Sequence, residues 1–265
     1  MGVWRAVLRR DWEIERTYQL RMLLVFTEVA VLAVGVYFVS KLIDDPAALA
    51  DYGGNYFDFA VVGLAVTSFA GVGLGGFSDS VVREQSTGTI ELLLASPAPL
   101  GSLLGGMLVL PFLLSSVQVA LLLGFGMGVA GSGIPLGGLA MSIPVLVLTT
   151  ITFAAVGMAS AGLILLAKRG DPISGPFYQL SMLLSGAIFP LDVLPRAVEV
   201  ISVLLPATWG IRAVRELLLN DAGWADVWPE VLVLCGFCVV MVPLGLWAFR
   251  SSLRSARRQG LLGSY

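Results

Sequence analysis

The chain has 265 residues, of which 57% are hydrophobic and only 13% are charged. A soluble globular domain is about 45–50% apolar and about 25% charged, so the composition excludes an ordinary soluble domain. The mean hydropathy of +0.89 agrees with this. The 16 basic residues are few and scattered, which argues against a nucleic-acid partner. We therefore predict an all-α integral membrane protein that is surrounded by membrane lipids.

Six segments are apolar enough and long enough to be membrane-spanning helices, which need about 20 apolar residues. The third and fourth are longer than a bilayer requires, so we expect them to tilt or to protrude. We predict one transmembrane domain over residues 1–265 with six transmembrane helices. These helices cover residues 22–40, 59–77, 103–129, 139–167, 172–189 and 229–249.

Residues 1–20 precede the first span and have an amphipathic pattern. Apolar residues such as Trp4 and Leu8 recur at helical spacing, and Arg5, Arg9 and Arg16 fall on the opposite face. This pattern predicts an interfacial helix that lies along the membrane surface. The pattern is consistent with a simple anchor or with a helix that also contacts a partner.

The distribution of basic residues predicts the orientation. Only four of the 16 Lys and Arg residues, Lys41, Arg196, Arg212 and Arg215, fall on the side opposite to the N-terminus. Cytoplasmic loops of membrane proteins are enriched in Lys and Arg. We therefore predict a multi-pass protein of a bacterial plasma (inner) membrane with both termini in the cytoplasm.

Residues 79–102 form a charged segment between the second and third spans. Its first part can continue the second span, and Gly88 is expected to break that helix. Glu91 then favours a helix start, because acidic side chains stabilise the first turn of a helix. Pro97 and Pro99 end this helix. We predict a short cytoplasmic coupling helix that offers a surface to a partner.

Residues 191–219 predict two short helices instead of a span. Apolar residues recur at helical spacing on either side of Pro206, which breaks the chain between them. Each half is too short to cross a bilayer. We predict an extracellular pair of short re-entrant helices here.

The chain lacks the residues that most enzymes use. It contains no histidine, which removes the usual Ser-His and Cys-His pairs and most zinc sites. Its two lysines, Lys41 and Lys168, follow Ser40 and Ala167, so no Gly-Lys dipeptide and no Walker-A phosphate loop are present. We predict no catalytic residue, no metal site and no cofactor in this chain.

Two motifs resemble those of a known family. The stretch R-E-Q-S-T-G-T-I-E-L-L-L-A-S-P, residues 83–97, resembles the R-E-x-x-x-G-T-x-E-x-L-L-x-[ST]-P signature of type-2 ATP-binding-cassette exporter permeases. The stretches G-A-I-F-P-L-D-V-L-P, residues 186–195, and L-L-P-A-T-W, residues 204–209, are similar to the second signature of that family. The small daunorubicin-resistance-type permeases look most similar.

The resemblance implies a permease subunit of an ATP-driven exporter that moves an amphipathic or lipid-like substrate, such as a drug, lipid or glycolipid. It implies a second permease subunit, identical or different, and a nucleotide-binding ATPase subunit that holds ATP and Mg. The chain itself would not be an enzyme. The residues implied at the ATPase contact are Arg83, Glu84, Thr87, Gly88, Thr89 and Glu91, flanked by Arg5, Arg9 and Arg10.

The same resemblance implies a substrate path lined by the first, second and fifth spans, with Glu28, Thr67, Phe69, Tyr178 and Gln179 as candidates by position. Glu28 also stands out by itself, because a carboxylate inside a span is costly without a function or partner.

Two alternatives to an exporter permease are an ion-coupled secondary transporter that uses Glu28 and a membrane scaffold without transport activity.

Overall fold

The computed structural model of the protein describes residues 8–13, 19–42, 55–86, 100–130, 135–167, 171, 173–191 and 195–258. Within these ranges every regular element is a helix, which confirms the predicted all-α class. The coupling segment beyond residue 86, with Thr87, Gly88, Thr89 and Glu91, lies outside the described residues, as does Arg5.

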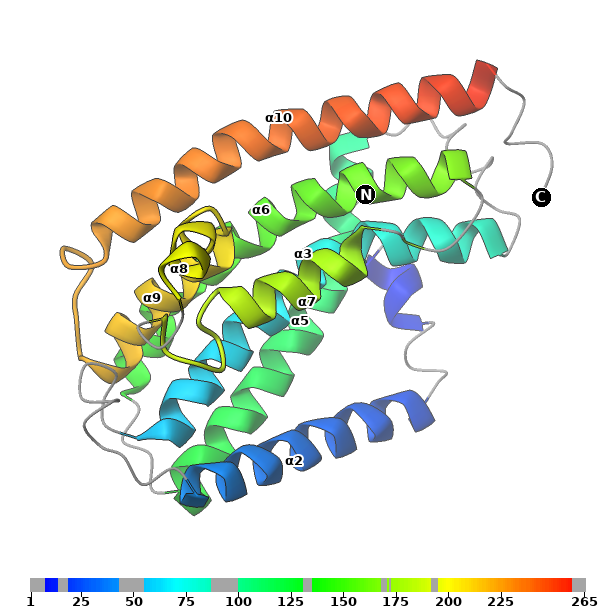
Figure 1. Cartoon of the computed structure of the whole chain (residues 1–265). Coiled ribbons are helices and arrows are strands. Elements are labelled where there is room, and N and C mark those ends of the chain that lie inside the picture. The colour runs from blue at the N-terminus through cyan, green and yellow to red at the C-terminus, as the bar shows by residue number, and fades with distance from the viewer. Residues whose placement is uncertain are drawn as a thin grey trace.

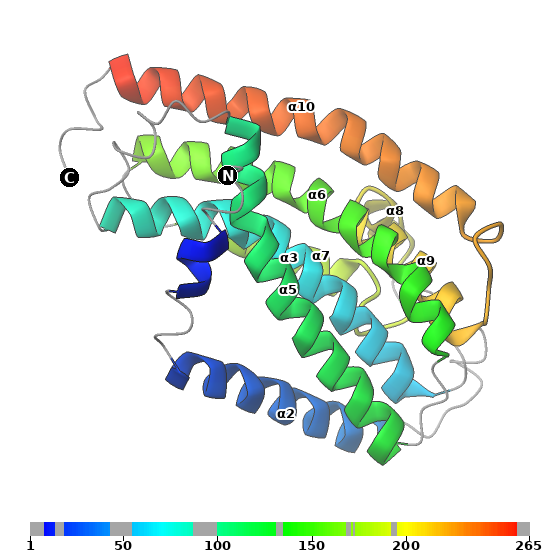
Figure 2. The same ribbon diagram turned by 180° about the vertical axis from the view of Figure 1, so that it is seen from behind.

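Five long helices lie side by side in the order α10, α6, α3, α5 and α2 (Figures 1 and 2). Each of them, with the π-helical extension counted as part of α5, is longer than the span predicted from the sequence. At 1.5 Å per residue, the 31 residues of α3 extend for about 46 Å. Their bounds are α2 Gln19–Leu42, α3 Tyr56–Ser86, α5 Leu100–Phe125 with a π-helical extension η2 Gly126–Ala130, α6 Leu136–Ala167 and α10 Trp228–Arg258.

Three shorter helices cover one face of this row: α7 (Ser174–Leu184), α8 (Arg196–Val203) and α9 (Pro206–Leu219). α9 packs between α3, α6 and α10, and most of its side chains are buried. Pro206 occupies the first turn of α9, where its missing N–H group costs no helical hydrogen bond. The chain therefore breaks between α8 and α9 at this proline.

α6 is the centre of the bundle, and glycines let it approach its neighbours closely. A Cβ atom on Gly157 of α6 would lie 2.8 Å from the carbonyl oxygen of Gly73 on α3. A Cβ on Gly245 of α10 would collide with the backbone of Ala155, and one on Gly138 with that of Leu217 in α9. Contacts of this kind hold helices together in lipid, where burial of apolar surface gives little driving force.

Four helices in the described part of the chain are long and apolar enough to cross a membrane: Tyr56–Arg83, Gly106–Gly128, Gly137–Leu166 and Trp228–Ala256. Val29–Leu42, within α2, is a shorter apolar stretch. Large apolar side chains face outward on these helices, with Val239 72% exposed and Trp247 65% exposed. Such surfaces are unfavourable in water and suited to lipid, in agreement with an integral membrane protein.

The predicted fifth span is where the structure differs most from the sequence analysis, and six spans are not confirmed. The sequence predicts a helix over residues 172–189, but α7 has only 11 residues and ends at Leu184. Its length of about 16 Å is half the thickness of a bilayer core. Gly186 then adopts a φ of +77°, which ends the helix.

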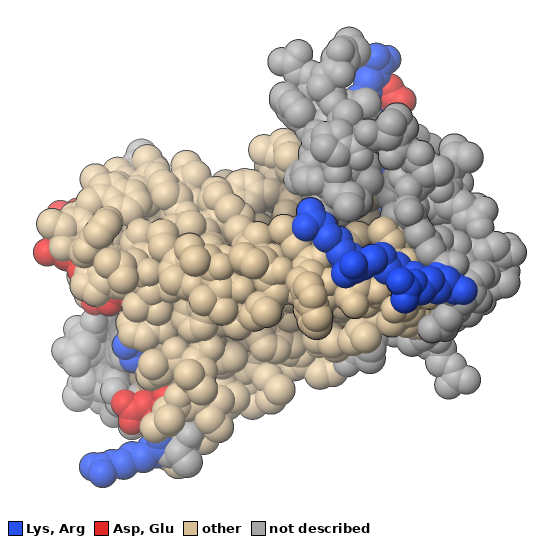
Figure 3. Space-filling model, turned by 90° about the horizontal axis from the view of Figure 1, so that it is seen from above, with Lys and Arg blue, Asp and Glu red and all other residues tan. Residues whose placement is uncertain are grey.

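Charged side chains gather at the two ends of the molecule, and a broad uncharged surface separates them (Figure 3). One end carries Arg83, the segment 8–13 and the last turns of α10 with Arg250 and Arg254. The other end carries the starts of α3 and α10 and the end of α9, with acidic residues such as Asp58 and Glu230. We call the first the arginine end and the second the acidic end.

Candidate functional site

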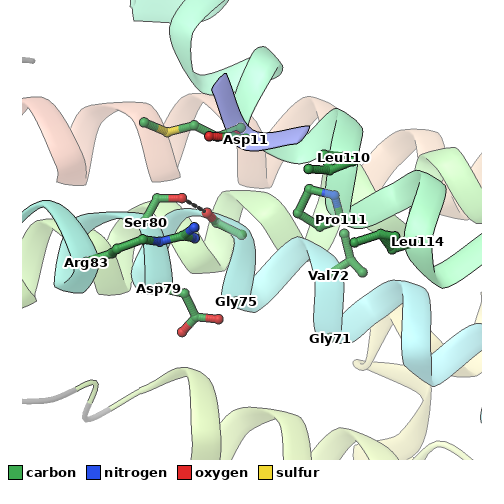
Figure 4. A pocket seen from close by; sticks show the side chains of 12 residues that line it. Asp11, Gly71, Val72, Gly75, Asp79, Ser80, Arg83, Leu110, Pro111 and Leu114 are labelled. Atoms are coloured by element: carbon green, nitrogen blue, oxygen red, sulfur yellow. Dashed lines mark hydrogen bonds between the residues drawn. The ribbon is translucent and has the colours of Figure 1, made fainter. Parts of the chain in front are cut away.

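A cavity of about 270 Å³ opens at the arginine end, where the segment 8–13 meets α3 and α5 (Figure 4). Its polar wall is formed by Asp11 from that segment and by Asp79 and Arg83 from α3. Leu110 and Leu114 of α5 give it an apolar wall. The cavity therefore combines charged groups of both signs with a hydrocarbon surface, an arrangement that fits an amphipathic molecule.

Small residues on α3 create this space. Gly71, Gly75 and Gly76 follow one face of the helix and line the cavity together with Ser80. A Cβ on Gly75 would lie 2.9 Å from Oδ2 of Asp79, so the carboxylate of Asp79 occupies the room that the glycine leaves. The hydroxyl of Ser80 donates to the carbonyl of Gly76 on the same helix.

Three of the residues that the resemblance implies at the ATPase contact lie close to this cavity. Arg83 lines it, and Arg9 and Arg10 belong to the same short helical segment as Asp11. Arg10 pairs with Asp11 at 3.0 Å, and Arg9 pairs with Glu13 at 2.9 Å. The structure thus brings together the N-terminal segment and the end of α3, where Asp11 and Arg83 are 72 residues apart in sequence. Glu84 lies in the last turn of α3, and the structure does not describe its side chain.

The structure describes four of the five candidates for the substrate path and places them in different surroundings. Thr67 and Phe69 are buried in the bundle, where the ring of Phe69 lies 4.9 Å from that of Phe112 on α5. The ring of Tyr178 on α7 packs over Gly71, and Gln179 beside it is exposed. Glu28 belongs to α2, but its side chain lies outside the described part. Their role in a substrate path stays a prediction.

Arg215 is the most deeply buried charged residue among those described, whereas the distribution of basic residues predicts only that it lies on the outer side. It is 6% exposed. Its guanidinium donates to the carbonyls of Gly186 at 2.9 Å, Phe59 at 3.0 Å and Ala187 at 3.1 Å. It also lies 3.5 Å from the centre of the Phe59 ring. Arg215 therefore joins α9 to the start of α3 and to the turn that ends α7.

Asp171 forms a second junction, near the arginine end, that was not predicted from the sequence. Its Oδ1 accepts a short hydrogen bond from the Ser160 hydroxyl of α6 and bonds from the backbone N–H groups of Ile173 and Ser174, where α7 begins. Burial opposes ionisation, but the hydrogen bonds outweigh it and lower the pKa of Asp171 to about 2. The charged carboxylate thus links the end of α6 to the first turn of α7.

The low pKa of Asp171 predicts a loss of stability in acid. Its carboxyl is more acidic in the folded protein than in the unfolded chain, so its contribution is complete above about pH 4 and is lost as the pH falls towards about 2. Unfolding temperatures measured across this range should fall for the wild type and stay flatter for Asp171→Asn. Ser160→Ala removes one donor and should move the transition to higher pH. Identical profiles for all three proteins would contradict the assignment.

A bundle of long apolar helices with a polar cavity at one charged end defines a polytopic helical membrane protein. The sequence model of the ABC-2 family transporter proteins matches residues 28–247, and the chain belongs to this family. It is accordingly a membrane component of an ABC transporter, and the family implies transport.

Curated relatives support this assignment. The chain is 27% identical over 213 residues to ABC transporter G family member 20 of Dictyostelium discoideum, a match of 77% of this chain and 28% of that protein. It is 35% identical over 104 residues to nodulation protein J of Rhizobium leguminosarum bv. viciae, covering 37% and 38% of the two chains. It is 24% identical over 119 residues to the linearmycin resistance permease protein LnrN of Bacillus subtilis (strain 168), covering 45% and 31%. The matches thus span well under half the length of each relative.

Proposed function

We propose that the chain is the permease subunit of an ATP-driven exporter that moves an amphipathic or lipid-like substrate out of the cytoplasm or the inner leaflet. The observation that carries this proposal is the cavity at the arginine end, in a chain of the ABC-2 family. It joins charged side chains to an apolar wall beside the residues implied at the ATPase contact. One relative is named a resistance permease, which fits an export function.

Energy enters this exporter through a separate nucleotide-binding subunit, which supplies ATP and Mg, because the chain has no Walker-A loop. Arg83 and the segment 8–13 form the described part of the contact surface for that subunit. Because cytoplasmic segments of membrane proteins are enriched in Lys and Arg, the basic residues of the arginine end support a cytoplasmic position for that end and for both termini, in a bacterial inner membrane. A second permease subunit, identical or different, completes the pathway.

The proposal predicts that transport depends on a partner. The chain co-expressed with the nucleotide-binding subunit encoded beside it should co-purify with that subunit and should transport only when ATP is present. The chain alone should neither hydrolyse ATP nor transport. Export by the chain alone, or the absence of any co-purifying ATPase, would contradict the proposal.

A substitution that fills the cavity at the arginine end should reduce transport without affecting the binding of the ATPase subunit. In Gly75→Leu the new side chain takes up room beside Asp79 in the lining of this cavity, so transport by the complex should fall about tenfold or more. Co-purification of the ATPase should not change. Gly236→Leu is the matched control, because a Cβ at Gly236 of α10 meets nothing within 4 Å. Equal transport by both variants would show that the cavity is not part of the path.

A further inference from the structure

The last turns of α10 carry three exposed arginines on one side of the helix. Arg250, Arg254 and Arg258 are spaced four residues apart, so each lies about one turn beyond the one before it. Figure 3 looks onto this helix and shows basic side chains in a row at the arginine end. Nε of Arg254 donates to the backbone carbonyl of Arg250 at 3.3 Å. We call these three residues the arginine stripe.

The arginine stripe has no acidic partner in the described part of the chain. No ion pair joins any of its three guanidinium groups to a carboxylate of the described residues. The sequence contains no Asp or Glu beyond Glu230, so the nearest acidic residue on α10 lies at its opposite end. Three like charges without a carboxylate beside them create a positive potential that attracts an anionic partner.

The stripe begins at the depth where the hydrocarbon core of a bilayer ends. No charged residue lies between Glu230 and Arg250, and this stretch of α10 extends for about 30 Å, which is the thickness of a hydrocarbon core. Arg254 lies about 6 Å further along the helix axis. The polar layer on each side of the core is about 5–8 Å thick, so Arg250 and Arg254 span the level of the lipid head groups.

The stripe also continues the lipid-facing side of α10. With 100° between successive residues, Trp247, Arg254 and Arg258 fall within about 40° of one another around the helix. The side chain of Trp247 is exposed on the uncharged surface that suits lipid. A lipid whose acyl chains lie against this surface therefore has its head group beside the arginines.

The opposite side of α10 holds the stripe in place. Phe249 and Leu253 are buried in an apolar cluster with residues of α6, and Ala256 is buried as well. A Cβ on Gly162 of α6 would touch the side chain of Ser252, so the two helices are in close contact behind the stripe. The backbone that carries the arginines is thus already ordered, which lowers the entropy cost of binding a partner.

We propose that the arginine stripe binds the head groups of anionic phospholipids in the leaflet around the arginine end. A guanidinium group presents its N–H donors in a fork that matches the oxygens of a phosphate. A zwitterionic phospholipid has the same phosphate but also carries a cationic amine, which the unpaired guanidinium groups repel. An anionic lipid such as phosphatidylglycerol lacks this amine. The inference concerns lipid binding and stands apart from ATP-driven export.

Brominated lipids test the inference in bilayers, because bromine on an acyl chain quenches the fluorescence of a tryptophan that it contacts. The full-length chain is reconstituted in phosphatidylcholine with rising fractions of brominated phosphatidylglycerol or brominated phosphatidylcholine. The quenching that is lost in Trp247→Phe reports the lipids beside the stripe. Phosphatidylglycerol should occupy this position about fivefold or more in preference to phosphatidylcholine at low salt. High salt should reduce the preference, because it screens exposed charges.

The double variant Arg250→Gln with Arg254→Gln should lower the preference for phosphatidylglycerol to about one. Arg196→Gln is the matched control, since Arg196 is an exposed arginine on α8, and it should keep the wild-type preference. Both variants should keep the wild-type unfolding temperature, because the arginines that they replace are exposed. A wild type without preference, or a double variant that keeps it, would overturn the proposal. Loss of the co-purifying ATPase with unchanged lipid preference would assign the stripe to that subunit instead.

Discussion

Arg215→Met will lower the stability of the protein by about 3 kcal/mol or more. Methionine fills much of the same space, but it leaves the carbonyls of Gly186, Ala187 and Phe59 without the donor that they share. Each buried carbonyl that loses its partner costs about 1–3 kcal/mol, and Arg215 is only 6% exposed. The turn after α7 should then detach from the start of α3.

The measurement is the unfolding temperature in detergent, together with limited proteolysis of the segment after α7. Arg215→Lys should be intermediate, because an ammonium group cannot reproduce the fork that the guanidinium offers to three acceptors. Arg196→Met is the matched control, since Arg196 is exposed at the start of α8. Equal stability of the Arg215→Met and Arg196→Met variants would show that the buried guanidinium is not needed to hold the turn.

Arg215 also explains why the predicted fifth span was wrong in length. An apolar run over residues 172–189 is typical of a span, and nothing near it signals an early end. The end depends on Gly186 at positive φ and on Arg215, which lies 29 residues further on and donates a hydrogen bond to the carbonyl of Gly186. One feature of the sequence does indicate that Arg215 is buried. Arg215 falls on the apolar arc of α9 with Ile211 and Leu218, and a cation on such an arc indicates a buried contact.

Other features depend on local rules and were predictable from the sequence. Apolar runs of helical length indicate the long helices, and Pro206 indicates the break between α8 and α9 because its ring cannot continue a helix. Residues of the cavity at the arginine end were predictable only in part. Arg83 belongs to a recognisable motif and Asp79 lies one turn before it on the same helix, whereas Asp11 joins them only when the segment 8–13 packs against α3.

Glycine spacing along the sequence likewise fails to predict which helices pack closely in this protein. Gly124 and Gly128 are four residues apart, a spacing typical of closely packed membrane helices. A Cβ on either of them would meet nothing within 4 Å. The close crossings instead use single glycines, such as Gly157 and Gly245, against the backbone of a distant helix. Spacing along one helix carries no information about which helix lies opposite.

Gly157→Val should therefore weaken the bundle at its centre. The Cβ atom would lie 2.8 Å from the carbonyl oxygen of Gly73 and closer still to that of Leu74, both of which belong to the backbone of α3 and cannot rotate away. The two helices must separate, and in lipid their association rests on this close packing. Overpacking of this kind costs about 1–3 kcal/mol. The neighbouring residues Phe153 and Ala154 would lose contacts with α3 as well.

The unfolding temperature of Gly157→Val should fall clearly below that of Gly236→Val, because a Cβ at Gly236 meets nothing within 4 Å. Gly73 lies on the other side of the same crossing, so Gly73→Val should cost a similar amount. The double variant should lose less than the sum of the two, since the first substitution has already separated the helices. Strict additivity would indicate two independent contacts and would contradict a single α3–α6 crossing as the centre of the bundle.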